Sequence, residues 1–181
     1  MNRVQFQSVD LLPVFGKPIY IQYCESQQGT KQHANALLVN NDTGKSVNDD
    51  VATRQVAWKT LIYSQLELMS GLIGLETELK LQESYVNRLK QGQSLHLLPK
   101  NDRILTGVWF IEEPKTQMVW TDNSEQWFAG LDLKFGNENL VNSNEFQFTP
   151  TEGNFCLYPS SMTLSIGHTG NNVSILEFYL K

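Results

Sequence analysis

The feature that most constrains this fold is a change of hydrophobic period near Leu79. Before that residue, apolar residues recur mainly at helical spacing; after it, they alternate with polar residues in short runs separated by turn residues. Side chains alternate across a β-strand with a period of two and repeat on a helix with a period near 3.6. The sequence therefore predicts helices in the amino-terminal part and strands from residue 79 to the end.

Nine alternating runs in the second part have the length of strands: 79–89, 94–98, 104–112, 116–121, 127–133, 145–149, 154–158, 162–167 and 173–180. Short strands at this spacing, with turn-rich breaks between them, are typical of a β-sandwich or β-barrel. One earlier run, 18–24, adds a strand before the helices. It begins at Pro18, whose missing N–H is tolerated at a strand start or sheet edge.

The clearest helix is predicted over residues 60–74. Its apolar residues predict one broad face packed on the core; they are Leu61, Leu66, Leu68, Met69, Leu72 and Ile73. Gly71 and Gly74 mark its end. A shorter helix is predicted from Thr30, whose side chain can cap the first turn.

Composition favours one soluble globular domain over residues 1–181, with the helices in 1–78 and a β core in 79–181. The net charge of −5 argues against a nucleic-acid-binding surface. No apolar run reaches the roughly 18 to 20 residues of a membrane span, and no signal-peptide run precedes Pro13, so a cytoplasmic site of synthesis is expected. Cys24 and Cys156 are far apart and outside any zinc-ligand spacing, which predicts buried, reduced thiols.

Common catalytic patterns are missing from the sequence. Ser160 and Ser161 are not in a G-x-S-x-G elbow, and no glycine-rich phosphate loop occurs. The carboxylates of Glu76, Glu78 and Glu83 fall at a helix-to-strand junction, where solvated charges are common. No catalytic residue is therefore predicted from these patterns.

Residues 83–115 resemble the central segment of a family of iron(II)- and 2-oxoglutarate-dependent oxygenases that is frequent in tailed bacteriophages of marine bacteria. In that family an E-S-W-x-N strand leads to a glycine turn, a histidine motif followed by proline, and an S-G-V-x-Y strand. The matching residues here are 83–87, Gly92, His96, Pro99, 106–110 and Pro114. Runs 12–21 and 153–180 are similar to the two ends of the family, so the resemblance covers nearly the whole chain.

The resemblance implies a double-stranded β-helix, which is a jelly-roll of the cupin type with two packed antiparallel sheets and amino-terminal helices on one of them. In active members of the family, iron is held by a histidine, by an Asp or His two residues on, and by a distant histidine. This facial arrangement leaves positions open for 2-oxoglutarate and oxygen. An arginine near the last strands pairs with the far carboxylate of 2-oxoglutarate.

This sequence departs from that pattern at most of the site positions. His96 stands at the first ligand position, but Leu98 and Leu164 occupy the other two and have no donor atom. Asn172 stands where the arginine is expected. The resemblance therefore predicts a degenerate site, with His96 as a remnant, with no catalytic, cofactor-binding or metal residue, and with neither iron nor 2-oxoglutarate as cofactor.

Two other residues could complete a divergent metal site with His96. Asp102 follows a turn and would need an unusual loop to reach the same ion. His168 falls in a turn and is expected to point to solvent. His33, on the short helix, is expected at the surface.

The leading hypothesis is a non-catalytic structural or assembly protein, in effect a pseudoenzyme. The resemblance places it in a phage virion, as a neck, tail or capsid-associated component assembled in the host cytoplasm. Its expected partners are other copies of itself in a homo-oligomer and neighbouring virion proteins, with no nucleic acid and no membrane. Candidate contact regions are residues 1–14, the Asn-rich loop 136–144 and the terminal strand to Lys181.

Two alternatives stay open. One is an active iron(II)/2-oxoglutarate hydroxylase that uses His96 with Asp102 or His168. The other is a glycan- or small-ligand-binding jelly-roll that uses the rings of Tyr85, Trp120 and Trp127.

Overall fold

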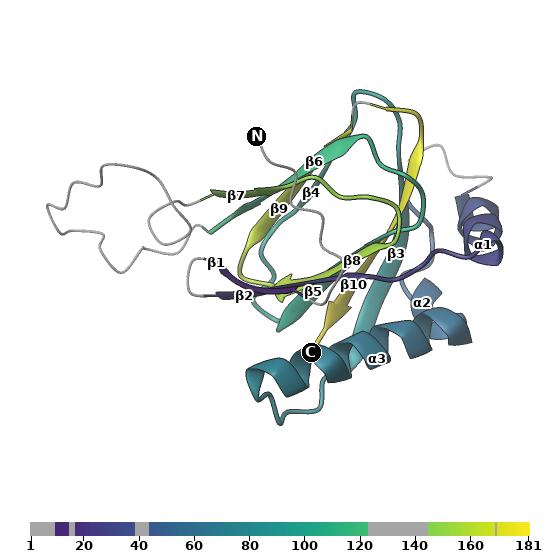
Figure 1. Ribbon diagram of the computed structural model, residues 1–181. Coiled ribbons are helices and arrows are strands. Elements are labelled where there is room, and N and C mark those ends of the chain that lie inside the picture. The colour runs from purple at the N-terminus through teal and green to yellow at the C-terminus, as the bar shows by residue number, and fades with distance from the viewer. Residues whose placement is uncertain (1–9, 15–16, 39–43, 123–144, 169) are drawn as a thin grey trace, which may run out of the picture.

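A computed structural model of the chain describes residues 10–14, 17–38, 44–122, 145–168 and 170–181. Two antiparallel β-sheets pack against each other, and helices cover the outer face of the larger sheet (Figure 1). The helices are α1 (Gln28–Leu38), α2 (Val51–Arg54) and α3 (Val56–Ile73). The strands are β1 (Asp10–Val14), β2 (Lys17–Tyr23), β3 (Leu81–Leu89), β4 (Ser94–Leu97), β5 (Leu105–Phe110), β6 (Thr116–Thr121), β7 (Glu145–Phe148), β8 (Asn154–Pro159), β9 (Thr163–His168) and β10 (Val173–Leu180).

The sheet topology confirms the predicted jelly-roll. The larger sheet has the order β1-β2-β8-β5-β10-β3, and the smaller sheet has the order β4-β9-β6-β7. From β3 onward the chain passes repeatedly from one sheet to the other, with β3, β5, β8 and β10 in the larger sheet and β4, β6, β7 and β9 in the smaller one. This winding is that of a double-stranded β-helix.

Most predicted elements form close to their predicted bounds, because their hydrophobic period is a local property of the chain. The predicted strand 127–133 lies outside the described residues. The early strand is not an edge: β2 pairs with β8 on one side and with β1 on the other.

The helix predicted to end near Gly74 does so, and Gly74 adopts the left-handed conformation with a φ of 68°. Within the described ranges, no helix is long and apolar enough to cross a membrane.

The central strands of the larger sheet are buried on both faces. Every residue of β5 and of β10 is buried, which explains why these strands read as nearly continuous apolar runs. Along β8, Phe155 and Leu157 face the helices, whereas Cys156 and Tyr158 lie between the two sheets. The molecule therefore has two apolar layers, one under the helices and one between the sheets.

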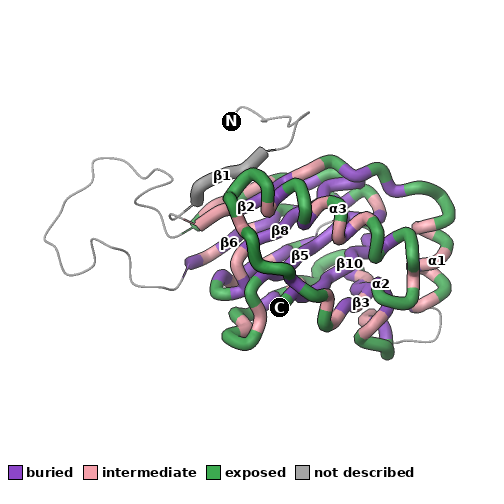
Figure 2. Tube along the Cα trace, turned by 90° about the horizontal axis from the view of Figure 1, so that it is seen from below, coloured by how far each residue is buried: buried purple, intermediate pink, exposed green. Residues whose placement is uncertain are grey.

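The predicted core face of α3 was correct only in part. Leu66 and Met69 are buried and Leu61 packs against the core, as predicted. The buried residues are Trp58, Ile62, Leu66 and Met69, and the edge of the Trp58 ring packs against Trp109 at 6.4 Å between centroids. Leu68 and Leu72, which belonged to the predicted core face, are 50% and 54% exposed. Helix α3 thus carries two apolar faces, and the one with the tryptophan packs on the sheet. Figure 2 shows α3 crossing in front of the strands of the larger sheet.

The segment 44–50 runs beside β3 and covers part of the edge of the larger sheet. Ser46 N–H donates to the carbonyl of Val86 at 2.8 Å, and Ser84 N–H donates to the carbonyl of Asp49 at 2.7 Å. Strand β10 lies inside the sheet between β5 and β3, so the terminal strand cannot be the contact edge that we expected. Of the expected contact region 1–14, residues 10–14 form β1, which pairs with β2 of the same chain. Residues 1–9 and the loop 136–144, the third expected region, lie outside the described residues.

Candidate functional site

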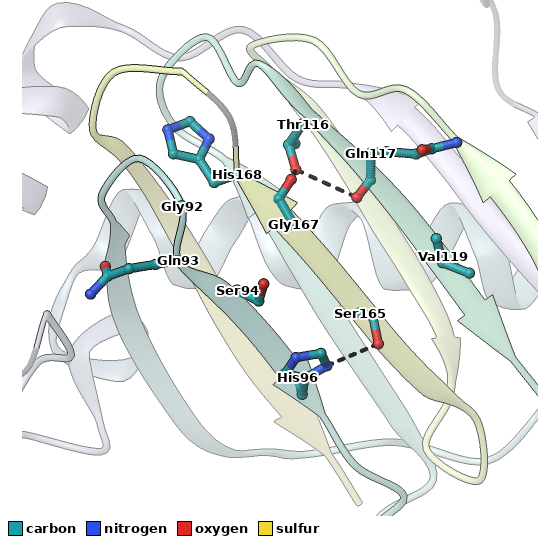
Figure 3. Close-up of a pocket in the computed structure, with 10 residues that line it drawn as sticks. All are labelled: Gly92, Gln93, Ser94, His96, Thr116, Gln117, Val119, Ser165, Gly167 and His168. Carbon is teal, nitrogen blue, oxygen red and sulfur yellow. Dashed lines mark hydrogen bonds between the residues drawn. The ribbon is translucent and has the colours of Figure 1, made fainter.

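The structure places His96 and Leu98 on the outside of the smaller sheet. His96 is exposed on β4, and its Nδ1 atom lies 3.0 Å from the Oγ atom of Ser165 on β9 (Figure 3). Leu98 follows the strand and is 68% exposed. The sequence held a signal for this result: Leu95 and Leu97 alternate with His96, and alternation assigns the two leucines to one face and the histidine to the other.

Leu164 stands at the position expected for the distal iron ligand, and it faces the space between the two sheets. Its cross-strand partner is Leu97, whereas His96 pairs with Ser165. Both leucines are buried. Large side chains pack around them and fill the space between the sheets: Met118, Trp120, Tyr158, Met162 and Ile166.

The other candidate residues are dispersed. Asn172 is exposed in the turn before β10, and the side chain of Asp102 is 66% exposed and paired with Arg103. His168 was expected to point to solvent, but it is only 2% exposed. Its ring nitrogen Nε2 donates to the backbone carbonyl of Asn171, and its backbone N–H donates to the carbonyl of Gln93. His33 is half-buried against the Trp58 ring.

An open depression lies on the outer face of the smaller sheet, over β4, β6 and β9, with a volume of about 660 Å³ (Figure 3). His96 and His168 lie at opposite ends of it and do not converge on a common point. Its lining residues are Gly92, Gln93, Ser94, His96, Thr116, Gln117, Val119, Ser165, Gly167 and His168. None of these is an acid, a lysine or an arginine, so the depression is lined by hydrogen-bonding groups and carries no carboxylate, ammonium or guanidinium group.

A buried carboxylate, Glu177, is the centre of a polar network that sequence reasoning missed. Glu177 is 1% exposed on β10. It accepts hydrogen bonds from Asn87 Nδ2 at 2.5 Å, Lys45 Nζ at 3.0 Å and Tyr179 Oη at 3.1 Å. The sequence did contain a signal for this network: β10 has a single acidic residue in an apolar run, and a buried carboxylate requires hydrogen-bonding or charged partners. The network joins the segment 44–50 to β3 and β10.

A second ionic cluster lies around Glu83. Lys100 and Arg103 both donate to its carboxylate, and the Lys100 ammonium lies 3.6 Å from the centroid of the Tyr179 ring. Burial acts to raise the pKa of Glu83, but the hydrogen bonds and positive charges of Lys100 and Arg103 outweigh it and hold the pKa below its ordinary value. Lys45 likewise lies 3.7 Å from the centroid of the Tyr85 ring.

The buried hydroxyls and thiols are held in their neutral forms at neutral pH. Burial, with a further contribution from Tyr179 and Glu177, raises the pKa of Tyr158 well above its ordinary value. Burial raises the pKa of the Cys24 thiol to about 12 and also raises that of Cys156. Since a nucleophilic cysteine needs a lowered pKa, neither thiol is activated.

The described residues do not fit the iron site that the resemblance implies. No three His, Cys, Asp or Glu side chains converge among them. The positions that face inward between β4 and β9 are Leu97 and Leu164, and His96 faces outward. Tyr158 Oη and Trp120 Nε1 lack hydrogen-bond partners among the described residues, but a phenol and an indole N–H do not make a facial set of iron ligands.

The aromatic ligand-binding site, which was the other alternative from the sequence, does not form a cavity among the described residues. Trp120 is fully buried and stacks on Phe146 at 5.6 Å between ring centroids. Trp127 lies outside the described residues. Trp120 is therefore part of the packed core between the sheets.

No protein-family model matches the chain, and no curated protein matches it in sequence. Solved structures match it in fold. The viral collagen prolyl hydroxylase vCPH from Paramecium bursaria Chlorella virus-1 is 11% identical with a TM-score of 0.56, over 98% of this chain and 96% of that one. HygX from Streptomyces hygroscopicus, with nickel and 2-oxoglutarate bound, is 10% identical with a TM-score of 0.55, over 90% and 81%. The epimerase SnoN, in complex with Fe³⁺ and α-ketoglutarate, is 13% identical with a TM-score of 0.56, over 90% and 78%.

These structures contradict two expectations from the sequence, namely that the chain is not an enzyme and that it has no cofactor. The fold that it shares is that of enzymes, a prolyl hydroxylase and an epimerase among them, and the same proteins are known with 2-oxoglutarate or iron bound. The expectations depended on three positions, Leu98, Leu164 and Asn172. The fold that the chain shares with these enzymes extends over at least 88% of its length.

Proposed function

We propose that this oxygenase-fold protein functions by assembly, associating with copies of itself and with neighbouring proteins of a phage particle. The resemblance of residues 83–115 to a phage-encoded family supports the setting in a virion. The jelly-roll fold supports a rigid building unit, although a fold by itself does not determine a function. The proposal concerns what the surface of the protein does and is independent of whether the chain also carries out a reaction.

One observation carries the proposal: large apolar side chains are exposed, and several of them gather on one helix. Contiguous exposed apolar surface on a soluble protein marks an interaction site. The exposed large apolar residues of the described chain are Tyr23, Val47, Val56, Leu68, Leu72, Ile73, Leu98 and Ile104. Four of these, Val56, Leu68, Leu72 and Ile73, belong to α3.

Analytical ultracentrifugation of the purified chain tests this function. We expect the weight-average mass to rise above the 20.6 kDa of one chain as the concentration increases, because association follows mass action. The same measurement with purified neck, tail and capsid proteins tests the other partners. A chain that stays monomeric at every concentration and binds none of these proteins would contradict the proposal.

A second candidate function is that of an iron(II)/2-oxoglutarate-dependent oxygenase, which the shared fold with vCPH, HygX and SnoN favours. Anaerobic titration of the chain with Fe(II), followed by an assay for succinate release from 2-oxoglutarate, tests it. One bound iron per chain with succinate release would support this function. The variant His96→Ala shows whether an iron site uses the exposed histidine, since loss of iron binding would place the metal at the outer face of the smaller sheet.

A further inference from the structure

The open depression on the outer face of the smaller sheet offers a place for a ligand outside the space between the sheets. Its volume of about 660 Å³ lies within the range of roughly 300–1,000 Å³ that is usual for small-molecule sites. Strand β9 runs along its middle, with β4 paired on one side and β6 on the other (Figure 3). The side chains of these three strands therefore decide what the depression can bind.

Small side chains run along the middle of the depression, and longer ones flank them. On β9 these small residues are Ser165 and Gly167, and an added Cβ atom at Gly167 would meet nothing within 4 Å. Gly167 pairs with Ser94 on β4 and with Gln117 on β6, and Ser165 pairs with His96. Cross-strand partners stand on the same face of a sheet. The outer face thus has a shallow channel along β9 with polar side chains on both sides.

The polar groups of this channel can both donate and accept hydrogen bonds. The Nδ1 atom of His96 lies 3.0 Å from the Oγ atom of Ser165, so this pair is in place without a ligand. A hydroxyl can take part in further bonds, because it has one donor and two acceptor positions. On the other side, Gln117 Nε2 donates to Gln147 Oε1 at 2.6 Å, which fixes the amide. A second N–H and the oxygen of that amide can bond a ligand.

His168 stands at one end of the depression and has a ring atom without a partner. Its Nε2 atom donates to the carbonyl of Asn171, so the neutral ring has Nδ1 as an acceptor. Among the described residues, this buried Nδ1 atom has no hydrogen-bond partner. A buried acceptor without a donor is unfavourable. This end of the depression therefore favours a ligand that carries an O–H group.

The lining favours a neutral ligand that is recognised by side chains. It contains no carboxylate, ammonium or guanidinium group with which a phosphate or another strongly ionic group would pair. Strands β6 and β9 are each paired on both sides, so their backbone groups are not open to the addition of a peptide strand. Val119 and the two glycines of the lining give a small apolar surface. Hydroxyl groups together with C–H surface are the chemistry of a sugar.

We infer that this depression binds a neutral carbohydrate, whose hydroxyl groups bond Ser94, His96, Ser165 and Gln117. The inference goes beyond the assembly function and is independent of it, because none of the exposed large apolar residues lines the depression. An open site with few apolar contacts holds its ligand weakly, and we expect a dissociation constant on the order of 1 mM.

Titration of the full chain with a panel of neutral hexasaccharides tests the inference. The panel contains hexasaccharides of glucose, mannose, galactose, xylose and N-acetylglucosamine, and two-dimensional NMR of the ¹⁵N-labelled chain reports binding. We expect at least one of them to shift the backbone N–H signal of Gly167 and the side-chain amide of Gln117, while the signals of α3 stay in place. No shift with any member at about 10 mM would overturn the inference. Tighter binding of the acidic hexasaccharide of hyaluronan than of every neutral one would also contradict it.

The substitution Gly167→Ile should abolish these shifts, because the new side chain extends into open space and fills the channel. Gly71→Ile on α3 is the matched control, since an added Cβ there also meets nothing within 4 Å, and it should bind as the wild type does. Gln117→Leu keeps the size of the side chain but loses the amide, and should raise the dissociation constant about twofold to tenfold. Circular dichroism checks that the three variants fold. Unchanged binding by folded Gly167→Ile would place the sugar elsewhere and overturn the inference, whereas the assembly function would stand.

Discussion

At the scale of single residues, Gly107 shows how closely the centre of the larger sheet is packed. It pairs with Phe178 across β5 and β10, and a Cβ atom at residue 107 would overlap the phenylalanine ring. Phe178 is fully buried and packs on Phe155 at 5.4 Å between centroids, so its ring has little room to move. An aromatic ring packed over a glycine on the next strand is a known device of sheets.

We predict that Gly107→Ala destabilises the protein by about 1–3 kcal/mol, the usual range for overpacking a core. The matched control is Gly167→Ala on β9, where an added Cβ meets nothing within 4 Å. Urea unfolding of both variants measures the effect. Equal stabilities for the two variants would show that the Phe178 ring moves aside without cost.

The ionic cluster of Glu83 makes a second prediction, about pH. The folded pKa of Glu83 lies below its ordinary value of 4.5, so the folded state prefers the charged form more than the unfolded state does. Its stabilising contribution is complete above the unfolded pKa and is lost as the pH falls through the folded pKa. We expect wild type to exceed Glu83→Gln in stability by about 1 kcal/mol at pH 7.

That difference should shrink as the pH falls below 4.5, since both chains then carry a neutral side chain at residue 83. Urea unfolding at a series of pH values between 7 and 3 measures it. A difference that stays constant through this range would mean that Glu83 contributes through packing rather than through its charge.

At the scale of elements, the network of Glu177 holds the segment 44–50 on the sheet edge. Lys45 and Glu177 are 132 residues apart in the chain, and the bond between them ties the segment to β10 as well as to β3. A covered edge has fewer unpaired backbone groups and so is less able to pair with another chain. The network therefore contributes both stability and protection of the edge.

We predict that Glu177→Gln costs about 2–3 kcal/mol, because Lys45, Asn87 and Tyr179 lose a charged acceptor. Lys45→Met should also destabilise the protein, since it leaves the buried carboxylate without its cation. The double variant should cost less than the sum of the two, by about 1–2 kcal/mol. Additive costs would show that the two side chains do not interact.

Hydrogen exchange at Ser46 gives a local readout of the same network. Its N–H bonds the carbonyl of Val86, and loosening of the segment exposes it to water. We expect faster exchange at Ser46 in Glu177→Gln than in the wild type.

At the scale of the whole molecule, the two thiols report on how the protein opens. Cys24 is 8% exposed and Cys156 is fully buried, and burial raises the pKa of both. We predict that neither reacts with a thiol reagent such as DTNB in the native protein at pH 8, and that both react when urea unfolds it. Since Cys156 lies between the sheets, its rate of reaction measures global unfolding.

Rapid labelling of one cysteine in the native state would contradict this prediction. Labelling of Cys24 alone would show that the end of β2 opens separately from the core. Labelling of Cys156 would show that the two sheets separate without complete unfolding.

The sequence by itself determined most elements of the fold. The period of two after Leu79 and the helical period before it are local properties, so the strands and helices follow from short stretches of chain. The resemblance through residues 83–115 gave the jelly-roll winding. Sequence positions also showed that Leu98 and Leu164 carry no metal-binding atoms, which holds in any fold.

Only the tertiary structure decided which way the key side chains face. Whether His96 points inward depends on the register of β4 against β9, and a shift of one residue would reverse it. Which apolar face of α3 is buried depends on the sheet beneath it, because both faces have helical spacing. The bond between Lys45 and Glu177 depends on strands that meet only when the whole chain winds. Each of these is a long-range property, and a local pattern contains no information about the partner that lies across the sheet.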